Sequence, residues 1–362
     1  MVKKPGDFMA VEVTEVLTQR TMQFFNNFPR NIYGNYYRAP SFPVLERSSP
    51  HFDRLFSRVE AQPFLALRKG QVVGRIAACV NHSVPDAGSG YFGYFETVND
   101  TAVAGALIKA AARWLADRGR SRMTGPVDLT PHERLGLLAS GFSGYHHPGM
   151  PYNPPYYSSL LARSGLETDV TLFGYHYDLR QPPPERLVRV AARAVRNGRL
   201  VLRPVNFNDP DGEGEIFSRI HNGSMHEIWG YAALSPEEGS AIWQKLRGHY
   251  DPSLILVAEL DGMPAALCLV FCPVQQKFFS GPAGGLNARL AVLSVLPRYR
   301  LKGLEAALII ESARRARARG VATLELSLVA ENNTMMNRII LSLPGVTRSR
   351  AYNVYKQAVD SV

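Results

Sequence analysis

Apolar side chains recur along the first half of the chain with the spacing of strands and then with the spacing of a helix. Two apolar runs, at residues 64–67 and 72–80, flank a glycine-containing turn, which is typical of two strands joined as a hairpin. Residues 91–96 form a further apolar run and predict a third strand. Residues 102–118 are apolar at helical spacing and stop before Gly119, a common helix end. The pattern predicts a hairpin, a strand and a helix, in that order.

The same order of elements returns in the second half. Two apolar runs flank an aspartyl-glycine turn, and a strand, a helix and a last strand follow, at residues 254–259, 265–271, 289–295, 304–319 and 322–329. Because the two orders match, we interpret the chain as an internal duplication whose copies have diverged in sequence.

Three consecutive prolines, at residues 182–184, lie between the copies. Proline cannot continue a helix or a central strand, so the run predicts a stiff linker, and residues 187–195 after it have the spacing of an amphipathic helix. A chain of 362 residues also exceeds what one hydrophobic core usually organises. We predict an α/β protein (an α+β mixed sheet) of two tandem domains, residues 1–180 and 187–362, with a linker at 181–186. Each domain is expected to hold a mixed, mostly antiparallel sheet flanked by helices.

Composition narrows the class of protein. The hydrophobic fraction of 46% and the charged fraction of 20% are those of an ordinary globular chain. There is no apolar run long enough to cross a membrane, and the first residues lack the apolar segment of a secretory signal. The three cysteines are few and odd in number, which argues against a disulfide framework. We therefore expect a cytoplasmic protein.

The formal net charge of +10 favours anionic partners, which include nucleic acid, a membrane surface, a phosphorylated cofactor and an acidic carrier protein. Scattered surface charge explains it equally well. No zinc-finger or basic-zipper pattern accompanies the charge, so nucleic acid is a minor hypothesis. The histidines and cysteines lack the spacing of a metal site, and no Gly-x-Ser-x-Gly elbow of a serine hydrolase occurs.

The stretch that carries chemistry follows the predicted strand at 289–295. Pro297 breaks that strand, Gly303 allows the backbone to come close to a ligand, and a helix begins at about Leu304. A loop that leads into a helix N-terminus directs free N–H groups and the positive end of the helix dipole at one point, which is a ready phosphate site. Arg298, Arg300 and Lys302 add positive charge to it.

Here the sequence resembles the GNAT acyltransferase superfamily, whose acyl-CoA loop has the pattern Val-x-Pro-x-x-(Arg/Gln)-x-x-Gly-x-(Gly/Ala). The pattern is matched in spacing by Val295, Pro297, Arg300 and Gly303. The resemblance extends over about residues 200–356 and includes the strand at 323–329, the segment Glu331 to Asn337 and the closing Tyr352-Asn353-Val354-Tyr355. In the first half, motifs such as Gly93-Tyr94-Phe95-Glu96 and Tyr152-Asn153-Pro154-Pro155 resemble a group of bacterial two-domain GNAT-like proteins.

The resemblance implies an N-acyltransferase that uses acyl-CoA or acetyl-CoA as co-substrate, with no metal. The residues implied to bind the donor are Val295, Arg298, Arg300, Leu301, Lys302, Gly303, Leu304, Glu305, Ala306 and Asn332. Glu305 departs from the family, which has Gly or Ala there, and a carboxylate facing a diphosphate would repel it by about 1 kcal/mol. Either Glu305 points away from the loop, or the donor is not a standard CoA thioester. We favour the first, because the three cations offset the charge.

The first half has no such loop. At residues 95–104, Asp100 or Thr101 has the character of an ordinary helix N-cap. We interpret this half as a degenerate GNAT-like domain that does not bind CoA. The aromatic, proline-rich segment 141–157 predicts an ordered loop that either lines a groove between the halves or joins them as a staple.

Candidate catalytic residues follow from the resemblance and from burial. The family's usual acid is a tyrosine, and this chain has Ile339 and Ile340 in that region instead. Tyr352 or Tyr355 on the last strand is the candidate substitute; the alternative is that both are core aromatics. Glu325 is a carboxylate in an apolar strand and a candidate base, although an ion pair with an arginine explains it equally well. Around His221 to Tyr231, the residues expected at the acceptor are Glu227 (also a catalytic candidate), Trp229 and Tyr231.

The function we expect is direct transfer of an acyl group from acyl-CoA, or from an acyl carrier protein, to an amine on a small molecule or lipid precursor. N-acylation of a sphingoid base and tailoring in secondary metabolism are two versions. An aminoacyl-tRNA-dependent transferase is an alternative, because tandem GNAT-like domains occur there too. A non-catalytic protein that binds acyl thioesters is the other.

Overall fold

The computed structural model describes residues 10–34, 45, 52–196, 198–274 and 285–359. Its first half contains β1 (Glu12–Glu15), α1 (Gln19–Asn27), α2 (Pro29–Tyr33), α3 (Phe52–Leu55), β2 (Val59–Arg68), β3 (Gln71–Asn81), β4 (Ser89–Thr97), α4 (Thr101–Ala116), β5 (Arg122–Gly125), β6 (Leu137–Ser140), α5 (Tyr157–Arg163) and β7 (Glu167–Asp178). The second half contains α6 (Glu185–Val195), β8 (Leu200–Pro204), α7 (Pro210–Met225), α8 (Pro236–Leu246), β9 (Ile255–Leu260), β10 (Met263–Phe271), β11 (Leu286–Val295), α9 (Leu304–Ala318), β12 (Val321–Ala330), α10 (Thr334–Leu341) and β13 (Thr347–Ala358).

The predicted hairpins and helices are confirmed in both halves. The strands β2 and β3 pair antiparallel around Lys69 and Gly70, and β9 and β10 do so around Asp261 and Gly262. In each half the strand that follows the hairpin leads into a long helix, α4 or α9. The mixed α/β fold expected from the sequence is therefore correct.

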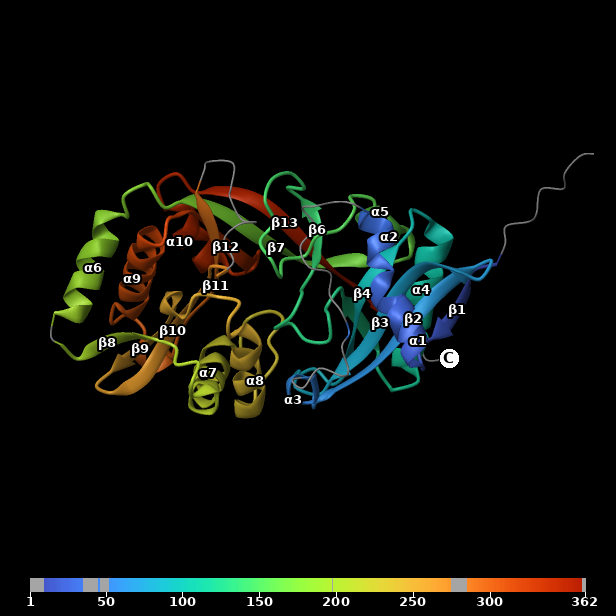
Figure 1. Cartoon of the computed structure of the whole chain (residues 1–362), viewed down its shortest axis with the longest axis horizontal. Coiled ribbons are helices and arrows are strands. Elements are labelled where there is room, and N and C mark those ends of the chain that lie inside the picture. Colours follow the sequence, from blue (N-terminus) through green and yellow to red (C-terminus); the bar gives the residue numbers. More distant parts are fainter. Residues whose placement is uncertain (1–9, 35–44, 46–51, 197, 275–284, 360–362) are drawn as a thin grey trace, which may run out of the picture.

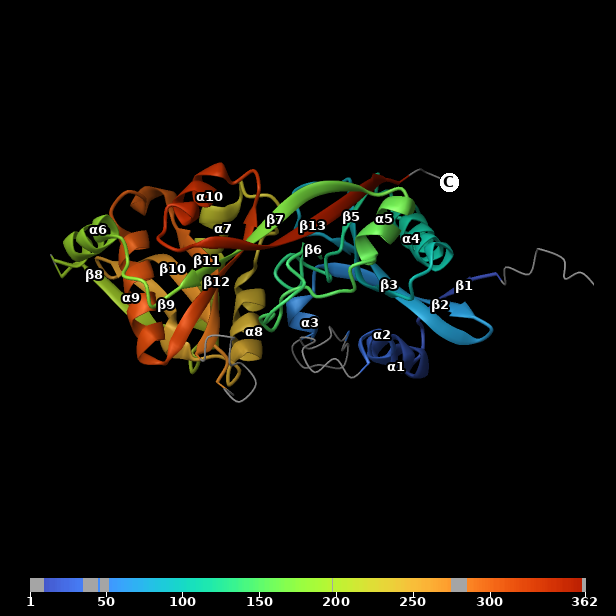
Figure 2. The ribbon, with the colours of Figure 1, turned by 90° about the horizontal axis from the view of Figure 1, so that it is seen from above.

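The two halves share one sheet instead of forming two separate ones. Among the described residues the strand order is β1-β2-β3-β4-β5-β13-β7-β12-β11-β10-β9-β8, with β6 paired to β13. The last strand of the first half, β7, pairs with β12, and the last strand of the chain, β13, pairs with β5. Each half therefore completes the other's sheet, and Figures 1 and 2 show β7 and β13 running side by side across the middle of the molecule. The linker at 181–186 lies beside this exchange, and its role as a domain boundary stays a prediction.

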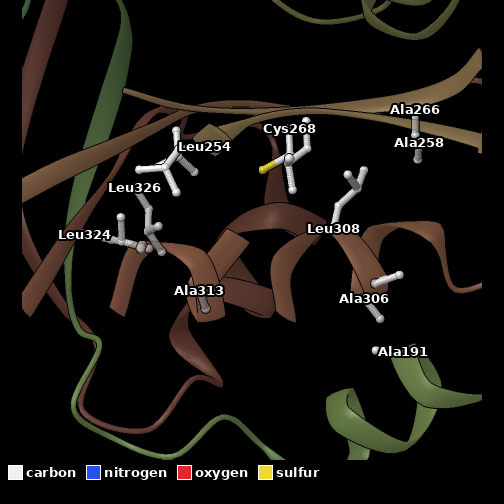
Figure 3. Close-up of a cluster of buried hydrophobic side chains, with 14 of the residues drawn as sticks. Ala191, Leu254, Ala258, Ala266, Cys268, Ala306, Leu308, Ala313, Leu324 and Leu326 are labelled. Carbon is white, nitrogen blue, oxygen red and sulfur yellow. The ribbon is translucent and has the colours of Figure 1, made fainter. Parts of the chain in front are cut away.

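Helices cover both faces of the second half's sheet. On one face α6, α9 and α10 pack on a core that includes Ala191, Ala306 and Ile340. On the other face α7 and α8 pack on a separate core around Phe217 and Trp243. Figure 3 shows Ala191 of α6 close to Ala306 of α9, where small side chains allow the two helices to approach. The N-terminal turn of α9 is thereby held against α6.

Candidate active site

The predicted donor loop forms as the sequence indicates. β11 ends at Val295, a short helical turn spans Pro297–Tyr299, and Gly303 is the N-cap of α9 with a φ of 84°. Only glycine adopts this conformation readily, which explains glycine at this position. No side chain caps the helix, and in the described part of the chain the N–H groups of residues 301–306 have no hydrogen-bond acceptor. Free N–H groups at a helix N-terminus are suited to phosphate oxygens, so the predicted role of this loop stays open to test.

Positive charge surrounds this loop. Arg298 and Lys302 lie 4.8 and 5.3 Å from the ring centroid of Tyr299, and Arg300 donates to the carbonyl oxygen of Ser224 over 3.4 Å. None of the three cations has a carboxylate within ion-pair distance among the described residues. Glu305, in the first turn of α9, is partly buried and likewise has no ion pair there. The loop therefore keeps an excess of positive charge.

The strands before and after α9, β11 and β12, separate from each other near this loop. β11 and β12 are parallel and pair from Leu286 to Leu290, opposite Val321 to Leu326. Beyond this point β11 stays paired with β10 as far as Val295, while β12 stays with β7. A β-bulge in the β10–β11 ladder lies at the point of separation and turns β11 away. The gap in the ladder leads from the middle of the sheet to the donor loop.

Glu325, the candidate base, is tied into an ion-pair network. Its Oε2 accepts from Nη1 of Arg350 over 2.8 Å, and its Oε1 accepts from the hydroxyl of Ser327 over 3.0 Å. Arg289, opposite Glu325 on β11, donates to the Oγ and the carbonyl oxygen of Ser327, each over 3.1 Å. The ion-pair explanation of Glu325 is thus observed. Its role as a base stays a prediction, because both carboxylate oxygens already accept a bond from the protein.

Tyr352, the candidate acid, lies fully buried near this network. Its hydroxyl has no hydrogen-bond partner among the described residues. Burial, and then the charge of Glu325, raise the pKa of Tyr352 well above its usual range. The raised pKa keeps the phenol protonated, so Tyr352 cannot act as the base, and its role as the acid stays a prediction. Tyr355 is also buried and packs in the core of the first half.

The residues expected at the acceptor separate into two groups. Trp229 packs against the cluster that contains Tyr352 and donates from Nε1 to Asp169 over 3.1 Å. Glu227 points to solvent, with its side chain 85% exposed. Tyr231 stacks on the ring of His221 and bonds Asn222. The structure therefore packs Trp229 on the cluster that contains Tyr352, and places Glu227 and Tyr231 in other surroundings.

The aromatic loop covers the Glu325 network and joins the halves. Arg350 donates to the carbonyl oxygen of Tyr145, and the Sδ of Met150 lies 3.7 Å from the Oγ of Ser327. The two ring nitrogens of His147 lie 2.9 Å from the carbonyl oxygens of Pro148 and Phe271, the second of which belongs to β10. The loop acts as a staple between the halves at the point where β11 and β12 part.

Sequence reasoning missed the arginines of this site. Arg289 interrupts an apolar strand, which is a signal of function or of pairing. Asn332 is exposed without a hydrogen bond in the described chain, and its role in binding the donor stays a prediction. Its neighbour Asn333 caps α10, and Asn337, which is buried, accepts from the hydroxyl of Tyr175 over 2.6 Å.

The corresponding position of the first half is closed. Asp100 caps α4 by accepting from the N–H groups of Ala102 and Val103, as the sequence predicts, and its other oxygen pairs with Arg68 over 2.9 Å. β4 and β5 pair only from Ser89 to Tyr91, and the chain after β5 then returns to β4, where the N–H of Val127 donates to Phe92 over 2.7 Å. In the first half, the carboxylate of Asp100 thus occupies the helix N-terminus, and the backbone at Val127 fills the space beside β4. The corresponding positions of the second half are open among the described residues.

Comparison with solved structures identifies this arrangement. A tandem GNAT protein from the clavulanic acid biosynthesis pathway superposes with a TM-score of 0.61 at 14% identity, covering 97% of this chain and 99% of that one. The chain has the tandem GNAT fold. A glucosamine N-acetyltransferase region of a fungal multi-domain GH3 β-N-acetylglucosaminidase superposes with a TM-score of 0.58 at 13% identity, covering 96% of this chain and 38% of that one.

The tandem GNAT chain is also similar to two curated bacterial proteins. It is 28% identical over 338 residues to a bacterial ceramide synthase of Caulobacter vibrioides, with 86% of this chain and 87% of that one covered. It is 26% identical over 323 residues to protein YghO of Escherichia coli, with 82% of each covered. No family model matches the chain. These likenesses agree with the resemblance to two-domain GNAT-like proteins and with a chain of the acyltransferase type.

The described residues contain no group of three or more His, Cys, Asp or Glu side chains placed to hold a metal ion. The helices described in this tandem GNAT fold are all too short or too polar to cross a membrane.

Proposed function

We propose that the chain is an N-acyltransferase that moves an acyl group from an acyl thioester, acyl-CoA in the first instance, to an amine. The observation that carries the proposal is the uncapped N-terminus of α9, with the N–H groups of residues 301–306 free and Arg298, Arg300 and Lys302 around them. Six N–H groups and three cations match the oxygens of a diphosphate.

The thioester arm would lie in the gap between β11 and β12, which runs from the donor loop toward Tyr352 and Glu325. The amine nitrogen attacks the thioester carbon, a C–N bond forms, and the C–S bond breaks. The leaving thiolate needs a proton, for which Tyr352 is the buried candidate donor. The amine must also lose a proton. Glu325 is one candidate to accept it, and water is the other, because the carboxylate of Glu325 is already ion-paired with Arg350.

One relative supports a class of acceptor. Similarity to a bacterial ceramide synthase over most of both chains supports a long-chain amine, such as a sphingoid base, as acceptor. At 28% identity to this relative, an acyl donor bound to a carrier protein and a smaller amine acceptor are further versions of the same proposal. We place the reaction in the cytoplasm, where acyl-CoA is available.

Thermal unfolding with CoA, acetyl-CoA, palmitoyl-CoA and tRNA tests the donor. A ligand held only by the folded protein at a hundred times its Kd stabilises it by about 2.7 kcal/mol, which is a plain shift in midpoint. We expect a shift with the CoA compounds and none with tRNA. A shift with tRNA alone would replace the proposal by an aminoacyl-tRNA-dependent transfer.

Release of free thiol from palmitoyl-CoA, measured with and without a sphingoid base, tests the transfer itself. We expect release that depends on the amine and an amide product by mass spectrometry. Binding of CoA without amine-dependent release for any amine offered would leave a non-catalytic thioester-binding protein.

A further inference from the structure

Large aliphatic side chains are exposed mainly on one part of the second half. More than half of the exposed large hydrophobic residues in the described chain belong to α6, to the donor loop or to α10: Val188, Val190, Val195, Leu301, Met335, Ile339 and Leu341. Leu301 is 99% exposed and Met335 is 70% exposed. Single exposed aliphatic residues are ordinary, but such a concentration marks an interaction surface.

These residues lie on, or next to, helices that cover the same face of the second half's sheet. The inner sides of α6, α9 and α10 pack on the same core through Ala191, Ala306 and Ile340, so their outer sides face the same way from the sheet. The donor loop adjoins α6, because a Cβ at Gly303 would lie 3.2 Å from Cγ1 of Val190. Figure 1 shows α6, α9 and α10 together at one end of the long axis. We call the surface made by α6, residues 298–302 and α10 the α6–α10 face.

Positive charge is interspersed with the aliphatic side chains. Across the described part of these elements, several exposed cations lack a carboxylate partner, namely Arg186, Arg193, Arg196, Arg298, Lys302 and Arg338. The carboxylate of Glu185 pairs with Arg189, and that of Glu311 pairs with Arg314 and Arg315. The α6–α10 face is therefore cationic and aliphatic at once.

We propose that the α6–α10 face docks on an anionic lipid bilayer. Guanidinium groups bind lipid phosphates, and aliphatic side chains between them enter the boundary of headgroups and acyl chains. An acidic protein partner would account for the cations, but it would not require aliphatic side chains distributed over α6, the donor loop and α10. The docked orientation places Leu301 of the donor loop at the lipid surface. Residues 298–302 of this face are also the proposed donor loop, so the inference rests in part on the proposed function, and the variants that test docking lie outside that loop.

Vesicle co-sedimentation of the full chain tests the docking. Vesicles of phosphatidylcholine alone are compared with vesicles of equal parts phosphatidylcholine and phosphatidylglycerol, at low and at high salt. We expect binding to the anionic vesicles only, weakened by salt. The double variant Arg186→Glu/Arg193→Glu should lose affinity at least about tenfold. The matched control Arg113→Glu/Arg163→Glu makes the same charge change on α4 and α5 of the first half and should bind as wild type.

A second variant, Met335→Ser/Leu341→Ser, removes aliphatic side chains from α10 without changing charge. It should fold with an unchanged CD spectrum and bind anionic vesicles several-fold more weakly. Failure of the wild type to bind anionic vesicles overturns the proposal. Equal binding by the charge variant and its control also overturns it. Unchanged binding by the serine variant, together with salt-sensitive binding to a purified acyl carrier protein, would assign the face to an acidic protein. Wild-type thiol release from a short acyl donor in each variant separates these outcomes from failure of the proposed function.

Discussion

The two halves use the same elements to opposite effect at the N-terminus of their long helix. In the second half, α9 begins at Gly303 with no side-chain cap and with free N–H groups beside three cations. In the first half, α4 begins at Asp100, whose carboxylate accepts the bonds that a phosphate would otherwise accept. A carboxylate at this point both fills the site and repels an anion. The comparison teaches that the residue at the N-cap is one feature by which a βα connection either stays open to an anion or becomes an ordinary helix start.

The neighbouring strands differ in the same sense. In the second half, β11 and β12 part after Leu290 and Leu326. In the first half, Val127 bonds back to Phe92, and a Cβ on Gly93 would overlap the carbonyl oxygen of Val127. Glycine at position 93 permits this close return of the backbone, which fills the gap that a thioester arm would need. Both comparisons support the proposal that the donor binds to the second half alone.

The largest effect is expected from Gly303→Asp. A Cβ there would lie 3.0 Å from Cβ of Ala194, the φ of 84° strains any L-residue, and a carboxylate would enter the phosphate site. Affinity for CoA, measured by calorimetry, should fall about 100-fold or more. Gly320→Asp is the matched control, with a φ of 80° at the other end of α9 and no atom within 4 Å of its Cβ. Wild-type affinity in Gly303→Asp would refute the placement of the site.

Neutralising the loop cations should have the next largest effect. Arg300→Ala or Lys302→Ala removes one charge that faces the donor's phosphates, so the Kd for CoA should rise about tenfold in each. Binding should also depend less on salt than in the wild type. Arg314→Ala, on the exposed side of α9, serves as the control. Equal affinity in all three variants would mean that the cations face solvent and not the donor.

Glu305→Ala should act in the opposite direction. Loss of a carboxylate near the diphosphate removes a repulsion of about 1 kcal/mol, so CoA should bind about fivefold more tightly. Glu215→Ala makes the same charge change on the exposed side of α7 and controls for net charge. Weaker CoA binding in Glu305→Ala would show that the carboxylate contributes to the site instead of opposing the donor.

The smallest effect on the donor is expected in the first half. Asp100→Ala removes the cap of α4 and its pair with Arg68, which should lower the free energy of unfolding by about 1 kcal/mol in urea titration. Asp100→Asn keeps a capping oxygen and should lose less. Neither variant should change the Kd for CoA, and a changed Kd would mean that this half takes part in binding the donor.

Local signals predicted the turns, the helices and the donor loop, because each depends on neighbouring residues such as Pro297, Gly303 and Asp100. The exchange of β7 and β13 could not be predicted in this way, because strand partners are chosen across the whole chain. Glu325 could be identified from the sequence as a carboxylate in an apolar strand. Its partner Arg350 could not be identified, because it lies on β13, far away along the chain. Glu227 was placed at the acceptor from its region of sequence, and the structure shows it exposed just beyond the end of α7.

Hydrogen exchange of backbone amides with and without CoA tests the central claim most directly, because the claim concerns specific N–H groups. The account predicts that CoA slows exchange in residues 301–306 at the start of α9 and leaves residues 100–104 at the start of α4 unchanged. Calorimetry on the same sample establishes that CoA is bound. Slowed exchange at the start of α4, or bound CoA with no change at the start of α9, would contradict the assignment of the donor to the second half.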